Sequence, residues 1–245
     1  MILQAEHITK AYGERQVLQD VSISLQEGEL VCLLGVSGVG KTTLFNVLSG
    51  LTLPDSGRVL LEQEDITGKT GNLSYMLQKD LLLPHKTVLD NVALPLILKG
   101  VKKRDARNQA EEYFTQFGLQ GTENKYPGQL SGGMRQRAAL LRTYMCGDRV
   151  ALLDEPFSAL DTLTRTAMQE WYLQVMEEIQ LSTIFITHDI DEAILLSDRI
   201  YIMSGNPARI SDELIIEEPK PRSSEFLLSE TFIEYKRSIK KHFCQ

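Results

Sequence analysis

The sequence has few cysteines, no long apolar run and no excess of basic residues, and each of these shortages excludes a class of protein. The three cysteines, Cys32, Cys146 and Cys244, are odd in number and share no C-x-x-C spacing, so we expect neither a disulfide framework nor a zinc site. No stretch approaches the ~18 consecutive apolar residues that a membrane-spanning helix needs. The net charge of −7 argues against binding through a basic surface, so we expect no nucleic-acid partner.

The N-terminus and the composition are those of an ordinary globular protein. The start of the chain, MILQAEHITK, has neither the charged segment nor the long apolar segment of a secretion signal, so we expect none. Hydrophobic residues make up 42% of the chain and charged residues 24%, as in most globular proteins. The 245 residues can bury a full core, as one large α/β domain or as a domain with an inserted subdomain.

Segments typical of strands and of helices alternate along the chain. We expect strands in residues 1–34, with turns at YGER and QEGE, and in the Gly-flanked stretch SGRVLLEQEDI. Apolar residues at helical spacing follow in TTLFNVLSGL and from about residue 86 to 145, and a further helix is expected over 162–180. Strand-sized apolar runs return in RVALLDEP, STIFITHD and RIYIMSG. This alternation predicts an α/β fold with a parallel sheet that helices cover on both faces.

The long helical stretch interrupts the alternation of strands and helices, which indicates an insertion. We therefore expect one domain over residues 1–216, with a helical subdomain inserted at about 86–145. The stretch EEPKPRSS predicts a linker and the residues after it predict one charged amphipathic helix, so that 217–245 form a linker and a C-terminal helix. We expect this helix to be solvated. Contact with a membrane surface is the alternative, through Lys236, Arg237, Lys240 and Lys241.

A glycine-rich turn follows the buried strand that we expect in ELVCLLG. The stretch GVSGVGKTT fits the pattern G-x-x-x-x-G-K-[ST] with Gly35, Gly40, Lys41 and Thr42. Glycine accepts positive φ, successive N–H groups of such a turn form a nest for an anion, and a helix that begins near Lys41 adds its positive end. The pattern predicts a phosphate-binding loop; a plain glycine-rich turn between a strand and a helix is the alternative.

Acidic, amide and imidazole side chains follow three other expected strands. Asp154 and Glu155 end the strand in RVALLDEP, where Asp154 can hold Mg²⁺ through water and Glu155 can orient or deprotonate an attacking water. Gln78 in MLQKD follows another apolar strand, and its amide can reach the same ion or the same water. His188 ends the strand in FITHD and can contact a γ-phosphate, although a lone histidine at a strand end is usually structural.

The stretch LSGGMRQR combines a hydroxyl group and two glycines at the start of an expected helix. Ser131, Gly132 and Gly133 can present a hydroxyl and N–H groups to a phosphate. The alternative is a plain helix N-cap at Ser131. Two glycines in a first turn weaken a helix by about 1 kcal/mol each, and a plain cap does not need them.

Six stretches, in their order along the chain, resemble the ATP-binding subunits of ABC transporters: the phosphate loop GVSGVGKTT, the Gln loop LQKD, the signature motif LSGGMRQR, the strand ALLDEP, and the short stretches SALD and THD. The resemblance covers about residues 2–210. It implies a P-loop ATPase of the ABC type, with an N-terminal antiparallel β subdomain and an inserted helical subdomain. It also implies ATP and Mg²⁺ as ligands, and a dimer in which the phosphate loop of one copy faces the signature motif of the other.

The resemblance implies how the chain holds ATP and Mg²⁺. Tyr12 stacks on the adenine ring with Val17 nearby, and Lys41 reaches the β- and γ-phosphates. Thr42 and Gln78 reach Mg²⁺; many family members have serine in place of Thr42, and both residues supply the hydroxyl. The other contacts with ATP that the resemblance implies come from the phosphate loop and the signature motif: Gly35, Val36, Ser37, Gly38, Val39, Gly40, Thr43, Ser131, Gly132 and Gly133.

The resemblance also implies how ATP is hydrolysed. Glu155 is the catalytic base, His188 holds the γ-phosphate, and Asp161 of SALD crosses toward the partner copy. Work must then pass to a membrane part that this chain lacks. Leu81 to Leu83 can contact that part or fill the core of the helical subdomain, and both can hold together.

The later motifs are similar to those of one group of importers. DEPFSALDTLTR and THDIDEAILLSDRIYIMSGNPARI are similar to the importers of nitrate, sulfonates, taurine and pyrimidine precursors. This similarity implies the ATPase subunit of a bacterial importer of a small polar nutrient, peripheral on the cytoplasmic face of the cell membrane. The implied partners are transmembrane permease subunits and an external solute-binding protein. The 35 residues after PARI, 211–245, are too few for the β-barrel domain of sugar-type importers.

Other classes share part of this pattern. A GTPase needs N-K-x-D, and the Asn-Lys pair in NKYP has Pro127 where the aspartate should stand. A nucleotide kinase does not explain LSGGMRQR. ABC ATPases of translation or DNA repair usually carry two cassettes or a long coiled-coil insertion, and an ATP-sensing adaptor without turnover does not need both Glu155 and His188. A non-transport ABC ATPase of translation or DNA repair and the ATPase of an exporter remain as the alternatives.

Overall fold

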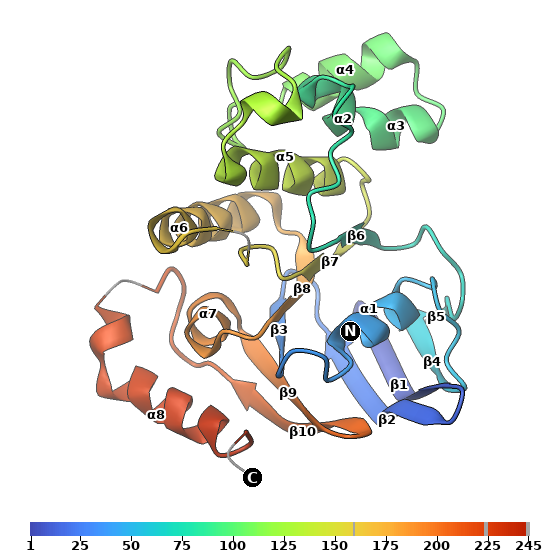
Figure 1. The fold of residues 1–245 in the computed structure, drawn as a ribbon, viewed down its shortest axis with the longest axis vertical. Coiled ribbons are helices and arrows are strands. Elements are labelled where there is room, and N and C mark those ends of the chain that lie inside the picture. The colour runs from blue at the N-terminus through green and yellow to red at the C-terminus, as the bar shows by residue number, and fades with distance from the viewer. Residues whose placement is uncertain (159, 223–224, 244–245) are drawn as a thin grey trace.

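The computed structural model describes residues 1–158, 160–222 and 225–243 (Figure 1). Within them the strands form one ten-stranded sheet in the order β5-β4-β1-β2-β10-β9-β3-β8-β7-β6. The strands are β1 (Leu3–Tyr12), β2 (Arg15–Leu25), β3 (Leu30–Leu34), β4 (Ser56–Leu61), β5 (Glu64–Asp65), β6 (Ser74–Met76), β7 (Val150–Asp154), β8 (Ser182–Thr187), β9 (Arg199–Gly205) and β10 (Ala208–Ile215). Strands β5, β4, β1 and β2 pair antiparallel, and β9, β3, β8, β7 and β6 pair parallel. The predicted α/β fold with an antiparallel N-terminal part is confirmed.

Alternate residues of β3 belong to two different cores, which explains why this strand is apolar throughout. Val31 and Leu33 pack in the core that contains helix α1 (Lys41–Leu48). Cys32 and Leu34 pack in the core on the opposite face, which contains residues of α5 (Gly132–Tyr144), α6 (Thr162–Ile179) and α7 (Ile190–Leu196). Helices therefore cover both faces of the parallel strands, as predicted, and fix the ends of these strands from two sides.

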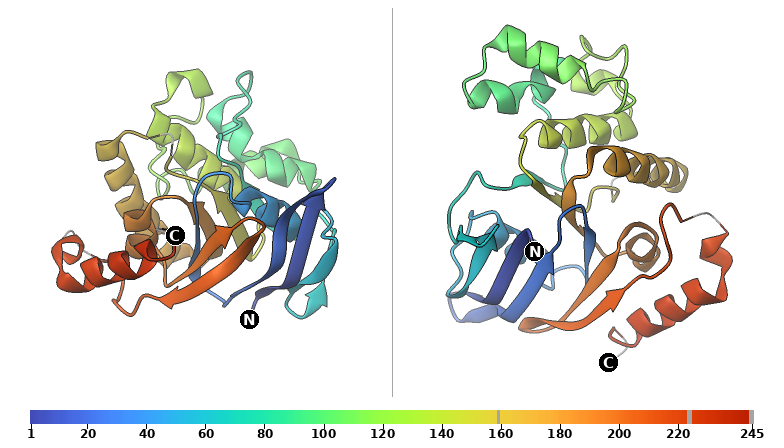
Figure 2. Two further views of the ribbon diagram at one scale, coloured as in Figure 1. Left: turned by 60° about the horizontal axis from the view of Figure 1, so that its bottom comes forward. Right: turned by 180° about the vertical axis from the view of Figure 1, so that it is seen from behind.

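The predicted helical stretch forms a group of helices at one end of the molecule (Figure 2). Its helices are α2 (Val88–Val92), α3 (Leu94–Leu98), α4 (Lys103–Glu111), the short 3₁₀ helix η1 (Pro127–Gln129) and α5. Pro95 in the first turn of α3 separates α3 from α2, since proline cannot donate an N–H within a helix. Within the stretch from about residue 86 to 145 that was expected to be helical, α4 ends at Glu111. Turns follow it, in which Phe114 and Phe117 are both buried in the core.

One strand was not predicted. The stretch ARISDELI forms β10, antiparallel to β9, and its burial alternates along the strand as in a sheet with one solvated face. The expected single strand in SGRVLLEQEDI is a hairpin of β4 and β5 that turns at Glu62 and Gln63, both at positive φ. In the described residues, no helix has the length and apolar character to cross a membrane.

The C-terminal helix packs against the body of the protein instead of standing free in solvent. After the 3₁₀ helix η2 (Phe226–Leu228), helix α8 (Glu230–Lys240) lies along α7 and buries Phe232 and Ile239. Lys236, one of the basic residues considered for membrane contact, lies 2.5 Å from Asp191 at the start of α7. The expectation of a solvated helix is therefore wrong for one face of α8. The division of the chain at residues 216 and 217 stays a prediction.

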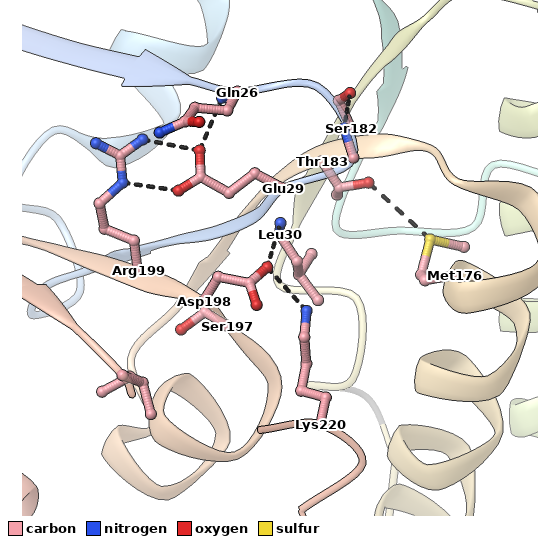
Figure 3. Close-up of polar contacts among 12 residues, drawn as sticks. Gln26, Glu29, Leu30, Met176, Ser182, Thr183, Ser197, Asp198, Arg199 and Lys220 are labelled. Atoms are coloured by element: carbon pink, nitrogen blue, oxygen red, sulfur yellow. Dashed lines mark hydrogen bonds and ion pairs between the residues drawn. The ribbon is translucent and has the colours of Figure 1, made fainter. Parts of the chain in front are cut away.

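Two polar contacts attach the segment before α8 to the sheet and to α7. Oδ2 of Asp198 accepts hydrogen bonds from the N–H of Leu30, at the start of β3, and from Nζ of Lys220 (Figure 3). The guanidinium group of Arg222 is buried, and its Nη1 donates to the carbonyl oxygens of Ile194 and Ser197, each at 2.7 Å. Arg222 thus pairs with carbonyl groups at the carboxyl end of α7, which have no partner within the helix.

Replacing Arg222 by alanine should lower the free energy of unfolding by about 2–3 kcal/mol, because buried carbonyl groups at the end of α7 lose their donor. Denaturant unfolding followed by circular dichroism measures the change. The control is Arg209→Ala, which removes an exposed arginine that donates to Gln19. If the two variants lose the same stability, Arg222 does not hold the end of α7.

Candidate active site

Four neighbouring parallel strands bring the predicted residues to one edge of the sheet. The order β3-β8-β7-β6 places the chain after each strand side by side. The phosphate loop follows β3, Asp154 ends β7, His188 follows β8, and Gln78 follows β6. Because the strands are parallel, these segments all leave the sheet at its carboxyl edge, where open α/β sheets bind ligands.

The phosphate loop has the backbone shape that its glycines predict. Gly40, at the N-cap of α1, has a φ of 126°, a conformation that strains any other residue. At Gly35 a Cβ atom would lie 2.7 Å from the carbonyl oxygen of Met203, so the loop passes too close to β9 for a side chain. Helix α1 then begins at Lys41 and directs its N-terminal N–H groups at the loop. An anion nest explains this arrangement better than a plain glycine-rich turn does.

Lys41 lies inside the loop as a buried cation. Its ammonium donates to the carbonyl oxygens of Gly35 at 2.7 Å and Val36 at 3.0 Å. Burial lowers the pKa of Lys41, while the charges of Glu155 and Asp154 act in the opposite direction. The ammonium is therefore held where an anion in the nest would meet it.

Thr42 and Asp154 meet beside the loop. The hydroxyl of Thr42 donates a 3.1 Å bond to Oδ2 of Asp154. Burial raises the pKa of Asp154, and the bond from Thr42 partly offsets this effect. No group of three or more His, Cys, Asp or Glu side chains in the described residues could hold a metal ion. A hydroxyl beside one carboxylate suits Mg²⁺, which keeps waters and phosphate oxygens as its other ligands.

Glu155 joins the other two predicted residues. One carboxylate oxygen accepts from Nε2 of Gln78 at 3.1 Å, and the other lies 3.1 Å from Nδ1 of His188. The backbone of Glu155 has a φ of 46°, a left-handed conformation that costs a non-glycine residue ~1–3 kcal/mol. Its N–H donates to the carbonyl of Ile186 in β8, which holds the turn in place. The structure thus groups three residues that are 77 and 33 positions apart in the sequence.

These residues surround a pocket of about 450 Å³. Tyr12 and Val17 of the antiparallel part lie at one end of its lining, and the loop and the carboxylates form the rest. The residues that line it are Tyr12, Arg15, Val17, Ser37, Gly38, Gly40, Lys41, Thr42, Thr43, Gln78, Asp154 and Glu155. Gly35, Val36, Val39 and His188 lie outside this lining.

Arg15 was missed by the sequence analysis. It begins β2 and lies two residues before Val17, so both side chains leave the same face of the strand. The alternation of side chains along a strand could have identified Arg15, because Val17, two residues further on, was already expected near the adenine ring. The arginine adds a positive charge to the lining of the pocket.

The predicted residues of the signature motif and of SALD lie outside this pocket. Ser131 caps α5 by accepting from the N–H of Met134, and Asp161 caps α6 by accepting from the N–H of Thr164. A Cβ atom at Gly133 would lie 3.2 Å from Thr164, so the two helix starts touch. None of Ser131, Gly132, Gly133 and Asp161 lines the pocket of Lys41, and Ala159 of SALD lies outside the described residues. Within one chain, the N-cap alternative for Ser131 is therefore correct.

The family model of the ABC transporter matches residues 18–158, more than half of the chain, and the chain belongs to this family. It is 40% identical to the formylaminopyrimidine import ATP-binding protein ThiZ of Halalkalibacterium halodurans, over 98% of this chain and 94% of that protein. It is 38% identical to the aliphatic sulfonates import ATP-binding protein SsuB of Bacillus cereus, over 98% and 93%. The nitrate transport protein NasD of Klebsiella oxytoca is 35% identical over 98% and 93%. The resemblance to this importer group is confirmed.

Solved structures show the same fold. The ATP-binding cassette MJ0796, in a dimeric post-hydrolysis state bound to ADP and Pi, superposes with a TM-score of 0.75 at 28% identity, over 89% of this chain and all of that chain. The cassette cbiO1 of Clostridium perfringens gives a TM-score of 0.81 over 97% and 99%, and its 23% identity supports the fold alone. The chain is an ATP-hydrolysing subunit of the ABC transporter family, as predicted.

Replacing Lys41 by alanine should weaken ATP binding roughly 10- to 100-fold, because a charge-assisted contact to phosphate is worth ~1.5–3 kcal/mol. Titration with a fluorescent ATP analogue measures the affinity. Lys125→Ala, which removes an exposed lysine of the helical group, is the control and should bind as the natural protein does. Equal affinity in both variants would rule out the loop as the phosphate site.

Proposed function

We propose that this chain is the ATPase subunit of a bacterial importer for a small, polar, organic nutrient. The carboxylate of Glu155, held between Gln78 and His188 beside the phosphate loop, is the observation that carries the proposal. The named relatives that import formylaminopyrimidine and aliphatic sulfonates support the class of cargo.

ATP fits the pocket from its adenine end to its phosphates. The ring of Tyr12 is half exposed beside Val17 and offers a stacking surface for adenine. Lys41 leaves the carbonyl oxygens of Gly35 and Val36 and bonds to the β- and γ-phosphates. The loop residues Ser37, Gly38, Val39, Gly40 and Thr43 surround the phosphates with backbone N–H groups and hydroxyls.

The pair of Thr42 and Asp154 fits a magnesium ion bound with the nucleotide. Thr42 and Asp154 would hold the ion, and Gln78, which bonds to Glu155 in this structure, would be a further ligand. Mg²⁺, when bound, neutralises the charge of the β- and γ-phosphates.

Hydrolysis needs an oriented water and a base. Glu155 accepts a proton from the water as the oxygen attacks the γ-phosphorus, the bond from that phosphorus to the β-phosphate oxygen breaks, and ADP and phosphate leave. His188 moves from Glu155 to the γ-phosphate and supports the charge there. The strained turn at Glu155 keeps the carboxylate in the pocket, so little reorganisation is needed during the reaction.

The site needs a second copy of the chain. Ser131 is exposed at the start of α5, with Gly132 half-buried and Gly133 buried behind it, and none of the three lines the pocket, so the partner copy supplies this helix start to the γ-phosphate. Asp161 at the neighbouring helix start faces the same partner. The dimeric cassettes of the family support this arrangement.

The work of hydrolysis passes to a separate permease in the membrane. Leu82 is buried in the core, while Leu81 beside it is 52% exposed. Leu82 therefore fills the core, and Leu81 is free to contact the membrane part. We propose that Leu81 contacts the permease on the cytoplasmic face of the membrane and that an external solute-binding protein delivers the nutrient.

Glu155→Gln should keep ATP affinity but lower turnover ~10²–10⁴-fold, since the amide cannot accept the proton of the attacking water. Phosphate release measures turnover. Glu14→Gln, which changes an exposed glutamate outside the pocket lining, is the control. Turnover of Glu155→Gln at the natural rate would exclude Glu155 as the base.

Reconstitution with the permease encoded beside this chain tests the direction of transport. In proteoliposomes, a loaded solute-binding protein should stimulate hydrolysis, and the nutrient should move toward the side that holds ATP. Proteoliposomes with Glu155→Gln should show neither effect. ATP-dependent movement away from that side, or no stimulation by any loaded binding protein, would overturn the assignment as an importer.

A further inference from the structure

Two polar side chains are buried between α6 and α7, behind the pocket. Gln169 of α6 and Glu192 of α7 are 7% and 6% exposed. Nε2 of Gln169 donates a hydrogen bond of 2.7 Å to Oε1 of Glu192. Such a pair is costly to bury, and two apolar residues of similar volume would pack there without that cost. The pair therefore indicates a requirement for one fixed geometry between the two helices.

Glu192 lies close to the residues that act on ATP. A small cavity of about 40 Å³ is lined by Glu192 together with Glu155 and His188. Burial raises the pKa of Glu192, while hydrogen bonds from Thr187 and Gln169 act against this increase. Thr187 directly precedes His188, so Glu192 holds the end of the strand from which His188 projects.

A second contact joins the same two elements. Nη2 of Arg165, in α6, donates to the carbonyl oxygen of Leu160, and Nη1 lies 3.8 Å from Oδ2 of Asp189. The other oxygen of Asp189 accepts from the first N–H groups of α7 and caps this helix. Helix α6 is therefore attached at two points, by Gln169 to α7 and by Arg165 to Asp189, which directly follows His188.

The start of α6 also presents groups to solvent. Leu163 is 84% exposed, although it is apolar and other large apolar residues of α6, such as Met168 and Tyr172, are buried. Asp161, at the N-cap of α6, is the residue that we proposed above to face the second copy. One end of α6 is thus open to a partner, and its middle is bonded to the element that carries His188.

We propose that Gln169 and Glu192 form a latch through which α6 sets the position of His188. When a second copy binds the start of α6, the latch moves α7 with it and aligns His188 with the γ-phosphate and Glu155. The inference rests on the proposed function, because it assumes that the two copies meet at α6. Neither Gln169 nor Glu192 lines the pocket of Lys41, and Glu192 reaches His188 only across the small cavity, so both are positioning residues.

Gln169→Leu should lower kcat about 10- to 100-fold, because a small misplacement of a catalytic group can reduce the rate by up to about 100-fold. The affinity for ATP should stay within about twofold of the natural value, since the latch lies outside the pocket. Glu192→Gln keeps an oxygen that accepts from Gln169 and should retain kcat within a few-fold. Gln174→Leu, at an exposed position of the same helix, should leave kcat unchanged.

Two further variants separate positioning from packing. The double variant Gln169→Leu with Glu192→Leu removes both members of the buried pair and should melt at a higher temperature than Gln169→Leu alone, yet keep the low kcat. In a Glu155→Gln background, Gln169→Leu should still form the ATP-bound dimer in sedimentation experiments. Natural kcat in the double variant, or loss of the ATP-bound dimer, would overturn the latch. Absence of turnover in the natural protein would instead refute the proposed function.

Discussion

The buried ammonium group of Lys41 is the interaction on which the site depends. Burying a cation is costly, and the carbonyl oxygens of Gly35 and Val36 offset the cost by bonding to it. These bonds fix the loop around the charge. Asp154 and Glu155 favour the charged form of Lys41 from the other side of the pocket. A triphosphate with its metal ion suits this arrangement, because it supplies an anion for the ammonium and a cation for the carboxylates.

The sheet provides the second constraint. Strands β3, β8, β7 and β6 lie next to one another, although long helical segments separate β6 from β7 and β7 from β8 in the sequence. Their burial on both faces leaves little freedom at their carboxyl ends. The left-handed turn at Glu155 is tolerated because the bond from its N–H to Ile186 ties it to a rigid neighbour. Rigid strands and one strained turn thus place Gln78, Glu155 and His188 within contact of one another.

The sequence was sufficient to predict the elements whose signals are local. Continuous apolar runs identified β3, β7 and β8, and the spacing of glycines, Lys41 and Thr42 identified the phosphate loop. Gln78 and His188 were expected near Glu155 from their places after apolar strands, which is a weak signal for either residue alone, and the family resemblance supported this expectation.

The features that were missed depend on contacts between distant segments. Helix α4 ends at Glu111 and turns bring Phe114 and Phe117 into the core, although the spacing of these two residues is also that of a helix. The amphipathic pattern of α8 did not show that α7 would cover its apolar face. A glutamine within a long helix carries no sign of a buried partner, so Gln169 and Glu192 became visible only in the structure.

The central claim is that one chain holds half of each ATP site. Mixing two inactive variants tests it most directly: Lys41→Ala, which lacks the phosphate contact, and Ser131→Arg, which blocks the helix start offered to the partner. The account predicts that neither variant alone hydrolyses ATP, while the mixture does, because each heterodimer contains one site with both Lys41 and Ser131 intact. Hydrolysis by Ser131→Arg alone, or a mixture as inactive as its components, would contradict it.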